Sequence, residues 1–408
     1  MIARCGTSLQ LLLVTLTINY TFLVIWCIWI YPRFFHPLRN FPAQRYTLND
    51  GIILLQGHGN SLLLTKLIPY AGVLVSHPYY FAKWDCVCSF LRPILGDGLV
   101  VVEGEQHKFL RKNTMPAFKF GRLKELYPMM WEKAVMLSET LKERVAAGES
   151  TIDMGVWASK VTLDIIGVAG LGRELNALKS PDDPLLKQFA ELVKPNKAKF
   201  IYFFLTSLFP PSLVHKLPLK SKNFTESELV DQLLTFLAAG HETIFSVFTW
   251  ATHLLATHPE AQAKLRAEVT AALPQYPNPS LSSSSAPSTD NISSILERLP
   301  YLNGVMHEAL RLYLTIPITV RVATQDTTLA GHPVAKGTEL ILSPWLVNRY
   351  TEIWGADAAE FRPERWIDVG PVTGNEKPNN TGGVASNYGQ MTFFAWAAEL
   401  YWAGVCKD

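Results

Sequence analysis

The sequence predicts a mainly α fold with a minor antiparallel β-sheet. Helix-compatible stretches dominate the chain and lie at residues 121–147, 151–171, 225–257, 259–273 and 301–313. After Pro317 the pattern changes to short β-branched runs separated by Gly331 and Gly337, which is typical of small hairpins. With 408 residues and 48% hydrophobic content, the chain can bury a large core, as one big domain or as two lobes.

Charge and cysteine content exclude several classes of function. A net charge of +2 gives no electrostatic reason to expect nucleic-acid binding. The five cysteines are odd in number and lack framework spacing, which argues against a disulfide scaffold and indicates a reducing compartment. Cys86 and Cys88 are too close together for a common zinc site, so we predict no metal site built from spaced protein ligands.

The first 31 residues are predicted to be an N-terminal membrane anchor. No charged residue lies between Arg4 and Arg33, and this interval is long enough to span a bilayer. It ends in Trp29–Pro32, an aromatic edge suited to the membrane interface, whereas a cleaved signal peptide would end in small residues. Arg33 and Arg39 outnumber Arg4, which places the rest of the chain on the cytoplasmic side.

The most informative segment is Thr235–Thr243, inside the long apolar helix. A central glycine costs about 1 kcal/mol relative to alanine, so Ala239 and Gly240 would leave a bare strip of backbone that something flat or bulky can approach. Thr243 lies four residues after Ala239, so its hydroxyl can bond that carbonyl, and Glu242 beside it can donate or accept a proton. The alternative is that Ala239 and Gly240 form a helix-crossing contact and that Thr243 is merely a satisfied hydroxyl.

A zinc-hydrolase helix is a second alternative for this segment, because His241 and Glu242 could open its motif. That motif requires a second histidine at position 245, where the chain has Phe245, and metal-dependent hydrolysis is therefore set aside.

Other charged residues are spaced for pairing. Glu308 and Arg311 lie three residues apart and so on one helix face, although such a pair alone is a weak signal. Arg365, in a later Phe-Arg-Pro-Glu-Arg-Trp run, could close a Glu-Arg-Arg network with them. Upstream, His107 and Arg111 form an i, i+4 pair of side chains that bind carboxylates.

Taken together, these elements resemble the cytochrome P-450 family of heme-thiolate monooxygenases, in its membrane-bound fungal form. The matching segments occur in the family order from the anchor to Trp366: Gly104–Lys108, Thr162–Gly167, Ala239–Thr243, Glu308–Arg311 and Phe361–Trp366. This joint match is highly specific, and it implies the cytochrome P-450 fold.

The resemblance also implies roles for the candidate residues. One group would deliver protons while dioxygen is cleaved in a largely dry pocket: Glu242 and Thr243, with Gly240 beside them. A second group would hold the heme propionates with fixed cationic donors: His107, Arg111 and Arg321. A third group would form a structural network that locks the core beneath the heme: Glu308, Arg311 and Arg365.

The chain departs from the family pattern in two places. Residues 217–220 run directly into 221–224, where the family has further helices over the substrate pocket, which indicates an internal deletion near residue 220. The cysteine loop F-x-x-G-x-R-x-C-x-G is absent, because counting from Phe393 would need Gly, Arg and Cys at Trp396, Ala398 and Leu400. Cys406 has neither the glycines nor the arginine around it. A heme iron of this class needs that thiolate as its axial ligand.

A one-base shift accounts for the altered C-terminal segment. When the codons permitted from Ala395 onward are read in the next frame, they can spell a peptide with the glycines, arginine and cysteine of the loop. Both glycines are forced, because the Trp396 and Trp402 codons are each followed by an alanine codon. We therefore expect an incomplete cytochrome P-450 fold whose product is frame-shifted or mis-spliced near residue 395.

Two hypotheses follow. The first is a heme-dependent monooxygenase in the endoplasmic reticulum membrane, which inserts one oxygen atom from O2 into an apolar small molecule. Its electrons would come from NADPH through a cytochrome P-450 reductase. The second is a non-catalytic remnant that cannot hold thiolate-ligated heme. In both, residues 1–31 anchor the chain and residues 32–408 form the catalytic domain, with a flexible Pro/Ser-rich loop at 274–291.

Overall fold

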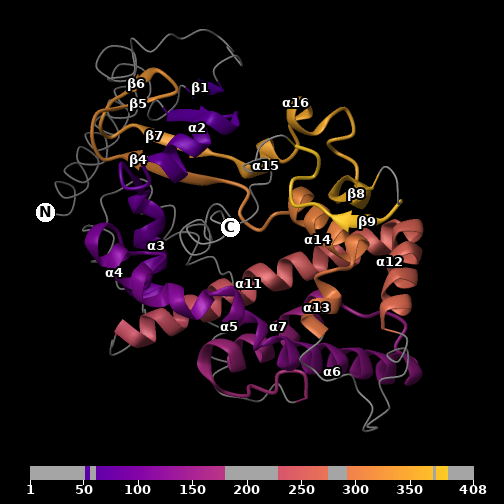
Figure 1. The fold of residues 1–408 in the computed structure, drawn as a ribbon. Coiled ribbons are helices and arrows are strands. Elements are labelled where there is room, and N and C mark those ends of the chain that lie inside the picture. The colour runs from indigo at the N-terminus through magenta and orange to yellow at the C-terminus, as the bar shows by residue number, and fades with distance from the viewer. Residues whose placement is uncertain (1–50, 56–60, 180–227, 274–291, 371–373, 385–408) are drawn as a thin grey trace, which may run out of the picture. The chain divides into compact units, whose positions relative to one another are not determined.

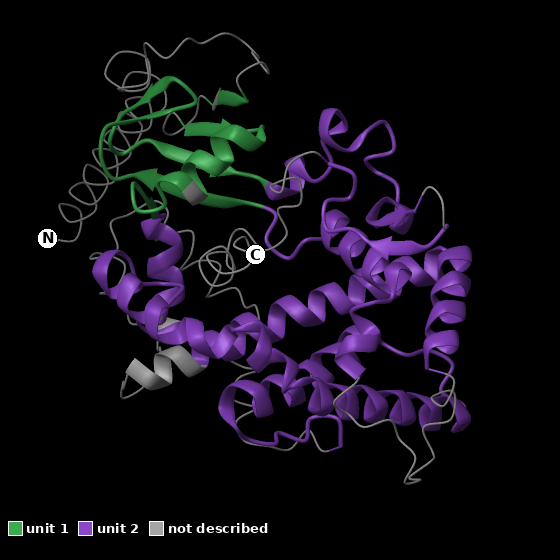
Figure 2. Ribbon diagram, in the orientation of Figure 1, with its two compact units in different colours: residues 1–82, 318–343 green, residues 83–317, 344–408 purple. Residues whose placement is uncertain are grey.

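A computed structural model describes residues 51–55, 61–179, 228–273, 292–370 and 374–384 (Figure 1). The predicted anchor, the segment around residue 220, the loop at 274–291 and the C-terminal segment with Cys406 lie outside these residues. The chain divides into two compact units (Figure 2), one formed by residues 1–82 and 318–343 and the other by residues 83–317 and 344–408.

The first unit is built on a five-stranded sheet of order β1-β2-β7-β4-β3. Its strands are β1 (Ile52–Leu55), β2 (Ser61–Leu64), β3 (Phe81–Lys83), β4 (Thr319–Ala323) and β7 (Glu339–Leu342). The prediction of an antiparallel sheet needs one correction, because β2 and β7 pair in parallel, with Leu62 opposite Leu340. These two strands are far apart in sequence, so no hairpin turn forces them to run in opposite directions.

A short hairpin beside this sheet confirms the change of pattern after Pro317. Strands β5 (Thr327–Leu329) and β6 (His332–Val334) pair antiparallel around Ala330 and Gly331. Both turn residues have positive φ, 48° and 84°, as a two-residue hairpin turn requires. The unit also contains α2 (Leu67–Ala71), where the hydroxyl of buried Tyr70 accepts a hydrogen bond from the backbone N–H of Ser343.

The second unit is mainly helical, which confirms the predicted fold class. Its larger helices are α3 (Asp85–Leu95), α4 (Gly104–Thr114), α6 (Tyr127–Ala146), α7 (Met154–Leu171), α11 (Glu228–Thr257), α12 (Pro259–Ala272) and α14 (Pro300–Leu312). Shorter elements complete it: η4 (Met115–Phe118), α5 (Phe120–Lys124), α13 (Ile292–Leu296), α15 (Pro344–Val347), α16 (Thr351–Trp354), η6 (Pro363–Trp366), and the hairpin of β8 (Ile367–Val369) and β9 (Glu376–Pro378).

The predicted helix at 121–147 is divided in two. Helix α5 ends at Lys124, and α6 starts at Tyr127 with a proline in its first turn. Proline fits the first turn of a helix, where its missing N–H would have no helical partner, so Pro128 starts a new helix here.

Helix α7 forms much of the core of this unit. Asp153 caps its first turn by accepting hydrogen bonds from the backbone N–H groups of Gly155 and Val156. Trp157 and Val161 are buried with residues of α6 in one hydrophobic cluster. Among the described residues, α7 is long and apolar enough to cross a membrane, with 33% of that window buried. Its packing within the unit identifies it as a core helix.

Candidate functional site

Helix α11 carries the predicted oxygen-handling residues. The hydroxyl of Thr243 donates to the carbonyl of Ala239 at 2.7 Å, the bond expected from their spacing. The carbonyl of Thr243 in turn accepts from the hydroxyl of Thr315 at 3.4 Å. The side chain of Glu242 is 39% exposed, so it is not sealed inside the helix packing. The helix therefore presents a carboxylate next to a hydroxyl that is tied back to its own backbone.

The structure shows which side chain Gly240 packs against. A Cβ on this residue would lie 2.6 Å from Cδ1 of Ile166 on α7, closer than side chains approach one another. The bare backbone at Ala239 and Gly240 is thus used where α7 and α11 lie against each other (Figure 1). This contact supports the helix-crossing alternative for Gly240.

Helix α14 positions Glu308 and Arg311 in the interior of the unit. Both side chains are 0% exposed. Oε2 of Glu308 accepts from Nε of Arg311 at 2.8 Å, and Oε1 accepts from Nη2 at 2.7 Å, a bidentate pair. Nε of Arg365 donates to the same Oε1 at 3.1 Å. The structure thus brings together the three residues of the predicted network.

Backbone carbonyls satisfy the rest of the Arg311 guanidinium. Its Nη1 donates to the carbonyls of Asn348 and Ala358, each at 2.6 Å, and its Nη2 donates to that of Glu360 at 3.1 Å. A buried ion pair is tolerated only when its remaining donors and acceptors are also paired. The network therefore ties α14 to the segments from 348 to 365, and it would be costly to open.

Two further residues of this network were not found from the sequence. Trp366 donates its indole N–H to Oε2 of Glu308 at 2.9 Å. Asp357 accepts from Nη1 of Arg362 at 2.6 Å and from Nη1 of Arg365 at 3.3 Å, and these hydrogen bonds hold the pKa of its carboxyl below the usual range. Trp366 directly follows Arg365 in the Phe-Arg-Pro-Glu-Arg-Trp run, and its place next to a predicted network residue was the one sequence feature that could have suggested its role.

The residues predicted to hold propionates lie in both units. His107 and Arg111 occupy one face of α4, where His107 is buried at 4% exposure and Arg111 is partly buried. Arg321 lies on β4, 6% exposed, opposite Leu340 of β7. Each is held on a regular element, which fixes the direction of its side chain.

Comparison with known proteins identifies the family. The cytochrome P450 family model matches residues 54–218 and 212–378. The chain belongs to the cytochrome P450 family. Among its relatives, the cytochrome P450 monooxygenase sphH of Aspergillus fumigatus is 35% identical over 448 residues, covering 91% of this chain and 80% of that protein. The cytochrome P450 monooxygenase FUM15 of Gibberella moniliformis is 31% identical over 463 residues, covering 91% and 77%. The monooxygenase ptmK of Penicillium ochrochloron is 31% identical, covering 85% and 75%.

Membership of the P450 family supports heme as the cofactor and monooxygenation as the general activity. Taken one by one, the imidazole of His107 and the guanidinium groups of Arg111 and Arg321 offer N–H donors of the kind that bind carboxylates. The described cysteines, Cys86 and Cys88, are buried on α3, and burial raises the pKa of the Cys88 thiol. Among described groups of His, Cys, Asp and Glu, none could hold a metal ion.

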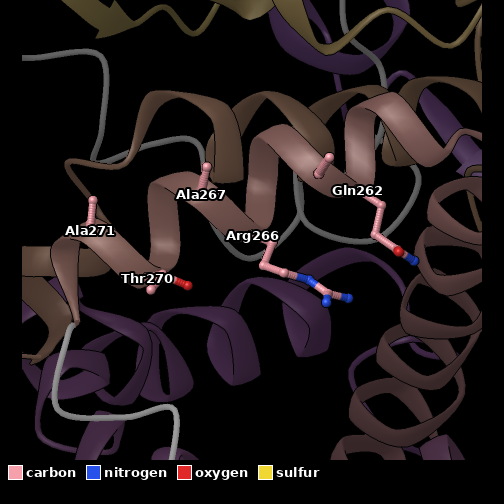
Figure 3. Close-up of a pocket in the computed structure, with 6 residues that line it drawn as sticks. Gln262, Arg266, Ala267, Thr270 and Ala271 are labelled. Atoms are coloured by element: carbon pink, nitrogen blue, oxygen red, sulfur yellow. The ribbon is translucent and has the colours of Figure 1, made fainter.

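An open depression lies on α12 of the helical unit (Figure 3). Its lining comes from α12 alone: Gln262, Ala263, Arg266, Ala267, Thr270 and Ala271. The alanines form a stripe four residues apart that leaves a shallow surface with Arg266 and Gln262 on it (Figure 3). None of the candidate residues lines this depression.

Proposed function

We propose that this scaffold is that of a membrane-anchored, heme-dependent monooxygenase that inserts one oxygen atom from O2 into an apolar small molecule. The observation that carries the proposal is the Glu242–Thr243 pair on α11, with the Thr243 hydroxyl bonded to the Ala239 carbonyl at 2.7 Å. Relatives of this chain are named cytochrome P450 monooxygenases. The second oxygen atom would leave as water, which requires two electrons and two protons.

Each residue group has a part in this proposal. Heme, when bound, supplies the activation of dioxygen. The protein's residues would hold and direct protons through Glu242 and Thr243, and Gly240 would let α7 approach α11 closely enough to exclude water. Donors to the propionates would be His107, Arg111 and Arg321. Glu308, Arg311 and Arg365 would keep the scaffold rigid, because their hydrogen bonds use every donor of the buried guanidinium of Arg311.

A reductase that draws on NADPH is the proposed electron source. Support comes from α4, where Lys108, Phe109 and Lys112 are exposed, with Phe109 63% exposed. Cations around an apolar side chain suit an acidic protein partner, because the charges steer the encounter and the apolar group adds buried area. Exchange of Lys112 for glutamate should slow electron transfer while leaving the fold unchanged.

The proposed location is the endoplasmic reticulum membrane, with a single span within residues 1–31 and residues 32–408 in the cytoplasm as the catalytic domain. Support comes from the uncharged interval between Arg4 and Arg33. Protease added to sealed microsomes should digest most of the chain. Complete protection would contradict this topology.

A second candidate function is a non-catalytic, frame-shifted or mis-spliced remnant, and specific observations favour it. Residues 393–408 do not contain the cysteine loop. The family match occurs in two segments that meet at 212–218, beside the proposed deletion, and the second segment ends at residue 378. An alignment of 448 residues to one relative exceeds the length of this 408-residue chain, so it contains gaps in this chain.

One experiment separates the two candidates. The 408-residue chain and a version with its C-terminal segment restored in the shifted frame are expressed, reduced under carbon monoxide and examined for the red-shifted Soret band of thiolate-ligated iron. We expect no band from the first protein and a band from the second. A clear band from the unmodified chain would reject the remnant and require Cys406 to be reconsidered as ligand. No band from either protein would reject the heme proposal for this scaffold.

A further inference from the structure

A line of three polar side chains crosses the contact between α7 and α11. The hydroxyl oxygen of Ser159 on α7 lies 3.0 Å from Nε2 of His241 on α11. Nδ1 of His241 lies 3.4 Å from Oε1 of Glu242. The imidazole side chain is 6% exposed, whereas that of Glu242 is 39% exposed. A buried ring therefore connects a hydroxyl on one helix with the predicted proton donor on the other.

The packing of the two helices explains why these residues meet. Ser159 and Ile166 lie seven residues apart, two turns along one face of α7. Ile166 fills the space left by the missing Cβ of Gly240, and Ser159 reaches the neighbouring residue, His241. The close crossing at the glycine thus sets the distance at which a short serine side chain can touch the imidazole.

The partners determine which ring nitrogen carries the proton. A carboxylate only accepts hydrogen bonds, so a lone pair on Nδ1 facing Oε1 of Glu242 would be repelled by it, whereas an N–H there is attracted. Nε2 then has the lone pair and accepts from the Ser159 hydroxyl. The Nδ1 to Oε1 separation of 3.4 Å is longer than a normal hydrogen bond, so this contact is mainly an electrostatic attraction.

A Ser-His-Glu line also suggests a hydrolytic triad, but the surroundings of Ser159 do not suit one. Ser159 lies within α7, Met154–Leu171, on the face that is packed against α11. Backbone N–H groups in the interior of a helix are used by the helix itself, so they cannot form an oxyanion hole. A substrate would also have to enter between two packed helices.

We propose that Ser159 and His241 are positioning residues for Glu242. Glu242 selects the Nδ1–H tautomer of His241, whose Nε2 then accepts from the Ser159 hydroxyl, and these two contacts hold the Glu242 side chain toward α7. The role of Glu242 as proton donor rests on the proposed monooxygenase function, whereas the tautomer of His241 can be measured in the chain without heme. Failure of the heme experiment and failure of this inference are thus distinguishable.

The test is 15N NMR of the 408-residue chain labelled at histidine, with the His241 signals assigned by their loss in His241→Gln. We expect Nδ1 to have the shift of a protonated nitrogen and Nε2 that of an unprotonated acceptor. Ser159→Ala should move the Nε2 signal toward that of a lone pair without a hydrogen-bond donor, and Ser159→Thr should restore it because it keeps the hydroxyl. Glu242→Gln removes the carboxylate that selects the tautomer, so it should move both signals toward those of an exchanging mixture.

Thr162→Val is the matched control, because its hydroxyl lies on the next turn of α7 and, among the residues that the structure describes, bonds to the carbonyls of Ala158 and Ser159. It should leave the His241 signals in place. An Nε2–H tautomer in the wild type, or identical spectra for the wild type and Ser159→Ala, would overturn the inference. If Ser159→Ala does not fold, Glu242→Gln and Ser159→Thr decide the outcome by the same signals.

Discussion

Trp366 donates its indole N–H to the carboxylate of Glu308 at 2.9 Å, and both side chains are fully buried. The Glu308 carboxylate also accepts from Arg311, from Arg365 and from the backbone N–H of Arg362. Its lone pairs are therefore fully occupied without any cofactor. The network can thus be tested for its effect on stability in the chain as it stands.

Glu308→Gln should lower the free energy of unfolding by about 3–5 kcal/mol, because it leaves the buried charge of Arg311 without its partner. Urea denaturation followed by tryptophan fluorescence measures the change. The control is Glu125→Gln, which breaks the exposed pair between Arg122 and Glu125 and should cost less than about 1 kcal/mol. Equal shifts in the two variants would contradict a stabilising role for the buried network.

Trp366→Phe should destabilise the chain more than Trp354→Phe. Both indoles are buried, but Trp366 donates to a carboxylate, whereas Trp354 donates to the neutral carbonyl of Val347 at 3.1 Å. A hydrogen bond to a charged group is worth about 1.5–3 kcal/mol and one between neutral groups about 0.5–1.5 kcal/mol. Urea midpoints of the two variants give the comparison, and a larger loss in Trp354→Phe would argue against the assignment of Trp366 to the network.

Gly304→Ala should destabilise the chain by about 1–3 kcal/mol, because its Cβ would lie 2.6 Å from the backbone oxygen of Pro363, which cannot move aside cheaply. Gly121→Ala in α5 is the matched control. A Cβ there meets nothing within 4 Å, so alanine should stabilise the helix by up to about 1 kcal/mol. Thermal unfolding monitored by circular dichroism distinguishes them. The packing argument would be wrong if both substitutions changed stability in the same direction.

Gly240→Ala tests the helix-crossing explanation of the central glycine. Its Cβ would meet the end of the Ile166 side chain at 2.6 Å, and Ile166→Val removes the atom in question, Cδ1. We expect Gly240→Ala to be destabilising in the wild type and less so, or stabilising, in the Ile166→Val background. The double-mutant cycle should give a coupling of about 0.5–3 kcal/mol. Independent effects would mean that the two residues do not share this contact.

Periodicity and spacing predicted much of the fold and of the site. Helices at 151–171, 259–273 and 301–313 correspond to α7, α12 and α14, because long apolar patterns specify helices well. The Thr243 hydroxyl bond to Ala239 followed from a spacing of four residues on one helix. These features depend on local sequence, and so the residues that form them can be read directly from it.

The features that were missed depend on which elements meet in three dimensions. A helix-crossing contact at Gly240 was one alternative from the sequence, but its partner Ile166 was not identified, and the contact between Ser159 and His241 depends on the same crossing. The parallel pairing of β2 with β7 joins Ser61–Leu64 to Glu339–Leu342. A single sequence contains no signal for such distant pairings. The residues of each helix or strand would form that element equally well if a different helix or strand were packed against it.

Acid should weaken the network through Asp357. Hydrogen bonds from Arg362 and Arg365 lower the pKa of this carboxyl in the folded state, so its stabilising contribution is present above the pKa of the unfolded chain, about 3.9, and is lost as the pH falls through the folded-state value. Asp357→Asn should lose that contribution at neutral pH. The difference in urea midpoint between the wild type and Asp357→Asn should therefore be largest near pH 7 and shrink below about pH 4. Asp97→Asn, which breaks the exposed pair with Arg92, should show a small difference throughout. A gap between the wild type and Asp357→Asn that widened as the pH fell would have the wrong sign for a lowered pKa.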